Sequence, residues 1–147
     1  MGAEKQLKIL MGALNLYRYN FRIMHWKSKG KQFKKVHELM ADYYEMLDGF
    51  IDEIAEISLM FNIEPLSYED TLTVLNASDL QFEQIQGRET FDCIEAVKKS
   101  GQFFNQLISL YEDVKKDMPG DITSKLEEHQ YTMRLESQYK GKMTLME

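Results

Sequence analysis

Two histidines and two carboxylates in one stretch of the chain are residue types that bind transition metals. His25 is followed twelve residues later by His37, and Asp52 and Glu56 lie further along the chain. Carboxylates are hard donors that stabilise Fe(III), whereas neutral imidazoles retain Fe(II). The four side chains therefore predict a site for iron or a similar metal.

The spacing of these four residues argues against a site built within one chain. Asp52 and Glu56 are four residues apart and share a helix face. His37 lies roughly 60° from Asp52 around the helix axis but about 22 Å away along it. His25, at the end of the preceding helix, can approach His37 but cannot reach Asp52. A two-fold dimer with antiparallel second helices would bring the histidines of one chain to the carboxylates of the other, giving two identical sites.

Apolar side chains at helical spacing predict the elements that must position these residues. Long helices are expected at about 5–28, 33–61, 91–117 and 121–140, with a short helix at 68–75. Gly30 ends the first helix, and Asp121 is the expected N-cap of the last, which should fade by Lys140. In the third helix the apolar periodicity turns Ile94 inward. The fold class is all-α: a four-helix bundle, in one domain over 1–147, with a short extra helix in the long connection between helices 2 and 3.

Composition and charge exclude several classes of protein. The 147 residues are 44% apolar and 29% charged, which is typical of a globular domain, and no apolar run approaches the length of a membrane span. The single cysteine, Cys93, excludes an internal disulfide, suits a cytoplasmic protein and is expected to be buried. The net charge of −6 argues against a general affinity for nucleic acid.

The stretch around the four candidate ligands resembles the Dps proteins, the mini-ferritins that protect DNA during starvation. The matching residues are His25-Trp26, Gly30, Phe33, His37-Glu38 and Asp52-Glu53-Ile54-Ala55-Glu56. Segments 67–75 and 126–133 resemble the short helix and the last helix of that family, so the likeness covers most of the chain.

This resemblance implies a ferritin-like fold, a hollow dodecamer built from two-fold dimers, and ferroxidase sites at the two-fold interfaces. Such proteins counter oxidative stress by oxidising Fe(II), commonly with hydrogen peroxide and otherwise with O2, and they store the ferric product as a mineral. Carried over to this chain, His25, Asp52 and Glu56 would hold the better-bound iron. Glu56 would bridge to a second iron supported by His37, and Trp26 would lie against the site.

The chain also departs from the family pattern. Ala41 stands where the family usually has an aspartate that helps to bind the second iron. Its neighbour Asp42 points about 100° away around the helix, and Glu38 is a further accessory candidate. Ile57 stands where an arginine commonly follows the last glutamate, and the final helix is shorter between its cap and His129.

Other interpretations of the same residues remain open. A histidine on an amphipathic helix is more often packed in a core than bound to a metal, and an isolated carboxylate pair is more often a solvated face. His129 lacks an E-x-x-H partner and is expected in the core or at an interface, which argues against a di-iron site inside one bundle. Five lysines surround the turn after the first helix, where a solvated surface is expected and contact with DNA phosphates is the alternative: Lys27, Lys29, Lys31, Lys34 and Lys35. Two rival functions therefore stand beside the ferroxidase: a non-enzymatic helical assembly with a degenerate iron site, and a DNA-compacting protein.

Overall fold

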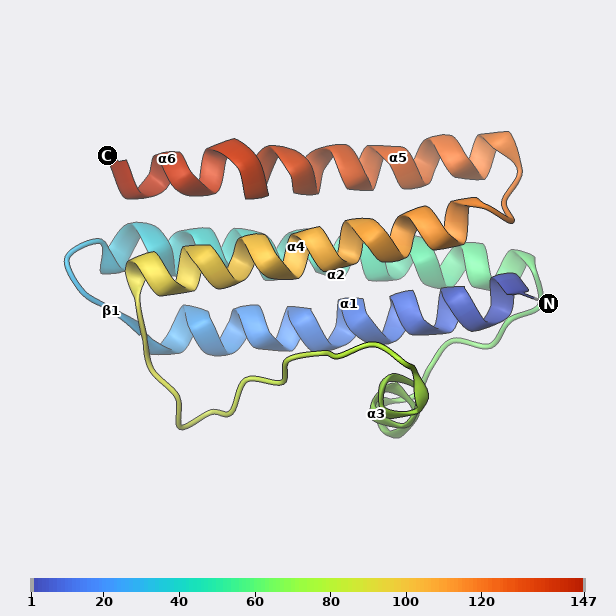
Figure 1. Cartoon of the computed structure of the whole chain (residues 1–147), viewed down its shortest axis with the longest axis horizontal. Coiled ribbons are helices and arrows are strands. Elements are labelled where there is room, and N and C mark those ends of the chain that lie inside the picture. Colours follow the sequence, from blue (N-terminus) through green and yellow to red (C-terminus); the bar gives the residue numbers. More distant parts are fainter. Residues whose placement is uncertain (1, 147) are drawn as a thin grey trace.

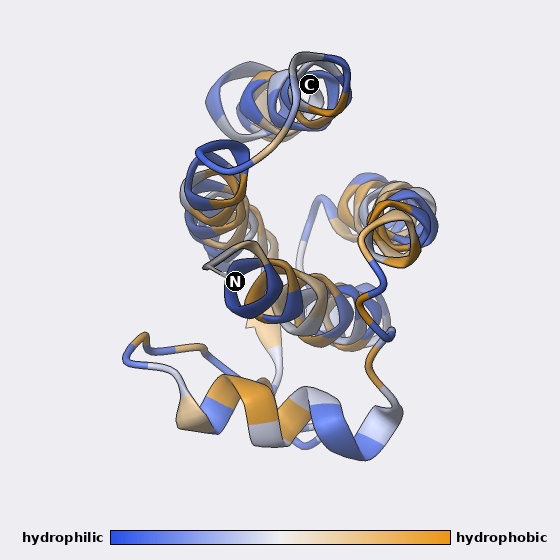
Figure 2. Ribbon diagram, turned by 90° about the vertical axis from the view of Figure 1, so that its right-hand side faces the viewer, coloured by the Kyte–Doolittle hydropathy of each residue, from blue (hydrophilic) through white to orange (hydrophobic). Residues whose placement is uncertain are grey.

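Four long helices run along one axis of the molecule, and a short helix lies across them (Figure 1). The computed structural model describes residues 2–146. The long helices are α1 (Gly2–Lys27), α2 (Phe33–Met60), α4 (Cys93–Lys115) and α5 (Gly120–Leu135), and the short one is α3 (Tyr68–Ala77). Figure 2, viewed along the bundle, places α3 on the side of α1 away from α5. The predicted all-α bundle with a short helix in its long connection is confirmed.

The core confirms the apolar periodicity of the first helix. All seven side chains that the periodicity selects on α1 are buried: Leu7, Leu10, Met11, Leu14, Tyr17, Phe21 and Met24. Phe21 packs at the centre, where its ring contacts Tyr43 of α2 and Phe103 and Phe104 of α4. Burying these rings together removes apolar area from water and so stabilises the bundle.

The turn that joins α1 to α2 is tied to the start of α4. Strand β1 (Ser28–Lys29) pairs in parallel with strand β2 (Phe91–Asp92). Gly30 follows with a φ of 121°, a backbone conformation that glycine adopts readily and other residues rarely do. The predicted break at Gly30 is therefore confirmed, and its position is held by residues more than sixty positions away in the sequence.

Two caps start helices after the long connection. Ser67 accepts a hydrogen bond from the backbone N–H of Asp70 at the start of α3, and Asp92 accepts one from Glu95 at the start of α4. Side-chain oxygens at these positions satisfy donors that the first helical turn leaves unpaired. These caps set where α3 crosses the bundle and where α4 rejoins it.

The start and the end of the last helix differ from the sequence-based prediction. Pro119 occupies the N-cap, so Asp121 lies in the first turn of α5, where its charge still suits the helix dipole. The helix does not fade at Lys140 but continues through a π-helical turn, η1 (Glu136–Lys140), into α6 (Gly141–Met146). A Cβ at Gly141 would lie only 3.0 Å from the Tyr43 hydroxyl, so a glycine there lets α6 pack closely on α2.

Two apolar residues at helix starts are exposed, and one of them, Ile94, was predicted to face inward. Ile94 is 70% exposed because Cys93, about 100° away around the helix, faces the β1 turn instead. The thiol of Cys93 is buried and donates a hydrogen bond to the carbonyl of Lys29. Phe33, at the start of α2, is 41% exposed, and its ring stacks on His37 rather than entering the core.

Candidate functional site

His25 and His37 form a stacked pair where α1 and α2 meet at the turn. Their rings are 3.7 Å apart between centroids and 17° from parallel. Nδ1 of His25 lies 2.6 Å from the backbone carbonyl oxygen of His37, and Nδ1 of His37 lies 2.6 Å from the carbonyl oxygen of His25. The approach of these two histidines, predicted from the turn between them, is confirmed.

The reciprocal hydrogen bonds determine which nitrogen of each ring can bind a metal. A carbonyl oxygen only accepts, so each Nδ1 must carry the proton and donate it. In the neutral ring, Nε2 then has the free lone pair. Metal-ligating histidines commonly use one nitrogen for the metal while the other donates to a carbonyl. The two hydrogen bonds therefore place the proton of each neutral ring on Nδ1 and the lone pair on Nε2.

Aromatic and cationic side chains cover one side of the histidine pair. The ring of Tyr44 meets His25 edge-on, with centroids 5.6 Å apart. The Arg22 guanidinium lies 5.0 Å from the Tyr44 ring centroid and 5.5 Å from that of Trp26. Trp26 directly follows His25, is 55% exposed, and shares the Arg22 guanidinium with Tyr44. Its place against a metal site stays a prediction. Sequence reasoning missed Arg22 and Tyr44 because neither residue type signals a metal site.

The carboxylates stay apart from the histidine pair within one chain. Asp52 and Glu56 are exposed on α2, and so are the accessory candidates Glu38 and Asp42. Among residues 2–146, no group of three or more histidine, cysteine, aspartate or glutamate side chains gathers closely enough to hold a metal ion. Within one chain the two histidines therefore lie near the turn, and the predicted carboxylates lie further along α2.

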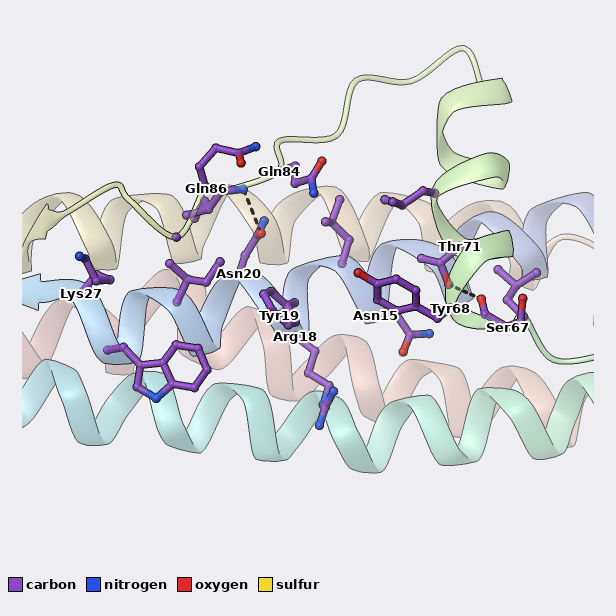
Figure 3. A pocket seen from close by; sticks show the side chains of 17 residues that line it. Asn15, Arg18, Tyr19, Asn20, Lys27, Ser67, Tyr68, Thr71, Gln84 and Gln86 are labelled. Atoms are coloured by element: carbon purple, nitrogen blue, oxygen red, sulfur yellow. Dashed lines mark hydrogen bonds between the residues drawn. The ribbon is translucent and has the colours of Figure 1, made fainter.

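A groove opens on the face of α1 that α3 crosses (Figure 3). It has a volume of about 560 Å³, and its walls come from α1, α3 and the connection around residues 84–87. Three aromatic side chains stand exposed along it: Tyr19, Trp26 and, at 87%, Tyr68. An exposed apolar surface rimmed by polar groups is typical of a contact surface between proteins.

His129 is buried in the core, as predicted, but it also has polar partners that the sequence did not reveal. Tyr111 of α4 lies 2.7 Å from its Nδ1, and Glu53 of α2 is hydrogen-bonded to its Nε2. Burial lowers the pKa of His129, and the Glu53 carboxylate partly opposes that shift. Burial likewise raises the pKa of Tyr111 well above its usual value.

The five lysines near the turn differ in how far they are exposed. Lys29, Lys31 and Lys34 are exposed, whereas Lys27 and Lys35 are half-buried. Contact of this cluster with DNA stays a prediction.

No helix within residues 2–146 has both the length and the apolar character to span a bilayer.

Comparison with known proteins identifies the family. The ferritin-like domain matches residues 4–135, so the chain belongs to the ferritin-like family. A search of curated sequences finds no significant match.

Solved structures confirm the Dps-like fold. Dps from Staphylococcus aureus has a TM-score of 0.73 at 17% identity, over 98% of this chain and 93% of that one. The dodecameric thioferritin, a bacterioferritin-related protein from Bacteroides fragilis, has a TM-score of 0.71 at 14% identity, over 98% and 89%. The Dps protein from Vibrio cholerae O1, described as a ferritin-like diiron-carboxylate protein, has a TM-score of 0.67 at 21% identity, over 98% of this chain and 85% of that one. The fold is thus that of the Dps proteins, as the resemblance in residues 25–56 predicts.

Proposed function

We propose that this chain is a Dps-like ferroxidase and iron-storage protein whose sites form between two chains. The observation that carries the proposal is the histidine pair. Because both Nδ1 atoms donate to backbone carbonyls, both Nε2 atoms are held ready to bind Fe(II) without a change of tautomer. The same two hydrogen bonds also join α1 to α2 at the turn.

The missing ligands come from a second copy in this proposal. A two-fold axis that lays the two α2 helices antiparallel brings His25 and His37 of one chain to the exposed Asp52 and Glu56 of the other. The Bacteroides fragilis relative is named as a dodecamer, which supports a larger cage built from these dimers.

The proposed reaction uses two Fe(II) ions and one hydrogen peroxide. Each Fe(II) gives one electron, the O–O bond breaks, and two hydroxide ions form, so no hydroxyl radical is released. Asp52 and Glu56 stabilise the ferric product, and the neutral imidazoles hold Fe(II) before oxidation. The ferric ions then leave as mineral into the cage, which removes peroxide and iron together.

Peroxide-driven oxidation tests the activity. Anaerobic protein is loaded with Fe(II), mixed with stoichiometric peroxide, and followed by ferric absorbance. Glu56→Ala should abolish the fast phase, and Glu45→Ala is the matched control because Glu45 is also an exposed carboxylate of α2. Oxidation no faster than in buffer in the unmodified protein would refute the ferroxidase and favour the non-enzymatic assembly.

Mixed chains test whether the site is shared. His25→Ala and Glu56→Ala chains are each inactive in this proposal, but a mixed dimer keeps one intact site formed by the unmodified His25 of one chain and the unmodified Glu56 of the other. After unfolding and refolding together, random pairing should restore about a quarter of the original activity. No restoration, with dimers formed normally, would refute the shared site.

A further inference from the structure

The π-helical turn η1 begins with a carboxylate that is only partly satisfied. Oε2 of Glu136 is buried, and no group within residues 2–146 forms a hydrogen bond to it. The backbone N–H of Gly141 donates to the carbonyl of Glu136, a span one residue longer than in an α-helix. Single π-helical turns inside α-helices are frequent at functional sites. Because a buried carboxylate oxygen is normally paired, a partner for Glu136 is expected.

A second polar group without a partner lies beside η1, on α2. Tyr43 is 1% exposed, and its hydroxyl forms no hydrogen bond to any other residue of the described range 2–146. The hydroxyl oxygen lies 3.0 Å from the position that a Cβ on Gly141 would take, at the end of the π-turn. Burial raises the pKa of Tyr43, and the charges of Glu136 and Asp42 raise it further. Both carboxylates therefore lie near this phenol.

Asp42 supplies the second carboxylate of the cluster. It directly precedes Tyr43 on α2, is exposed, and has no ion pair with another residue of the part of the chain that the structure describes. Burial raises the pKa of the Glu136 carboxyl, the Lys140 ammonium partly opposes that shift, and the Asp42 carboxylate adds to it. Two carboxylates and one ammonium thus meet between α2 and η1, so negative charge is in excess there.

The position of Asp42 separates this cluster from the predicted shared site. Ala41 stands four residues after His37 and shares its helix face, whereas Asp42 is turned about 100° from that face. The charge of Asp42 acts instead on Glu136 and Tyr43. The aspartate is therefore placed to work with η1 of its own chain.

We propose that Glu136, Asp42 and the Tyr43 hydroxyl form a site for a hard cation within one chain, separate from the site shared between chains. All three side chains offer oxygen atoms, which favour cations such as Mn²⁺, Ca²⁺ or Mg²⁺, with water completing the coordination. A water molecule alone would satisfy the hydrogen bonds but would leave the buried carboxylate charge uncompensated. A cation satisfies the Glu136 oxygen and balances the excess charge together.

Manganese binding tests the proposal. Metal-free full-length Glu56→Ala protein is titrated with Mn²⁺, and the electron paramagnetic resonance signal of free Mn²⁺ measures how much is bound. The Glu56→Ala background disables the predicted shared site, so the result does not depend on the proposed ferroxidase. We expect one bound Mn²⁺ per chain. Glu136→Gln and Asp42→Asn, each added to this background, should weaken binding at least about tenfold, because each removes one charge next to the cation.

Two further variants separate ligation from a general effect of charge. Glu45→Gln removes another exposed carboxylate of α2 and should leave Mn²⁺ binding unchanged. Lys140→Gln removes the ammonium that opposes the cation and should tighten binding. Circular dichroism checks that each variant is folded. Equal Mn²⁺ binding in the Glu136→Gln, Asp42→Asn and Glu45→Gln variants, or weaker binding in Lys140→Gln, overturns the site.

Terbium luminescence places the cation relative to Tyr43. Tb³⁺ is a hard cation that luminesces when a nearby phenol passes its excitation to it, and a Trp26→Phe background leaves tyrosine as the sensitiser. The signal should disappear in Tyr43→Phe, persist in Tyr44→Phe, and fall when Mn²⁺ is added in excess. A signal that Tyr43→Phe leaves unchanged overturns the assignment of the Tyr43 hydroxyl as a ligand.

Discussion

Removing the Tyr111 hydroxyl should measurably destabilise the folded chain, although tyrosine and phenylalanine have nearly the same shape. Tyr111→Phe removes a buried hydrogen bond and leaves Nδ1 of His129 without a partner. A buried polar group left unpaired costs about 1–3 kcal/mol, so the free energy of unfolding should fall by about that amount. For a chain of this length the melting temperature should then fall by about 2–12 °C.

Denaturant unfolding at fixed protein concentration measures this loss, because assembly adds a concentration-dependent contribution. Tyr43→Phe is the control, since the Tyr43 hydroxyl has no hydrogen-bond partner within residues 2–146. This variant should lose much less free energy of unfolding. In a double-mutant cycle with His129→Leu, the two substitutions should be non-additive by at least about 0.5 kcal/mol. Equal losses in the two phenylalanine variants, or strict additivity in the cycle, would refute the hydrogen-bonded pair as a stabilising unit.

Further predictions concern pH, the core, the thiol and the second iron. Because burial lowers the pKa of His129 in the folded chain, the unfolded chain binds more protons below the ordinary value of 6.5. The free energy of unfolding should therefore decrease as the pH falls through 6.5, by at most about 1.4 kcal/mol per pH unit, and a pH series on His129→Asn should lack this dependence. Leu14→Ala should cost about 2–5 kcal/mol in denaturant unfolding, because Leu14 is fully buried. Burial raises the pKa of the Cys93 thiol, so a thiol reagent should label it far more slowly in the folded than in the unfolded chain. Ala41→Asp should increase the Fe(II) bound per site in an anaerobic titration, and unchanged binding would show that Ala41 is not what limits the second iron.

Local sequence patterns predicted the parts of the structure that depend on neighbouring residues. The period of apolar residues identified the buried face of α1, and the glycine at position 30 marked the turn where the backbone adopts a positive φ. The apolar period predicted burial less well at the ends of helices. Ile94 fits the apolar period, but the first turn of α4 presents Cys93 to the β1 turn, and periodicity does not report which neighbour covers a helix end.

For the candidate site, too, the sequence predicted some features and only the packing of the helices determined the others. Residue type and spacing alone identified His25, His37, Asp52 and Glu56 as candidates and indicated that the two pairs lie too far apart to meet within one chain. That conclusion follows from the fixed rise of a helix and needs no tertiary contact.

Only the tertiary structure decided the chemical state in which these side chains are held. Nδ1 of each histidine, His25 and His37, lies beside the backbone carbonyl oxygen of the other because α1 and α2 pack side by side beyond the turn. Tyr111, His129 and Glu53 come from three helices, and Glu53 precedes His129 by 76 positions. Helical periodicity describes the faces of one helix, whereas a hydrogen bond between helices depends on the register in which they pack. The sequence therefore determined which residues face inward or outward, and the packing determined which nitrogen donates, which accepts, and which phenol lies beside a base.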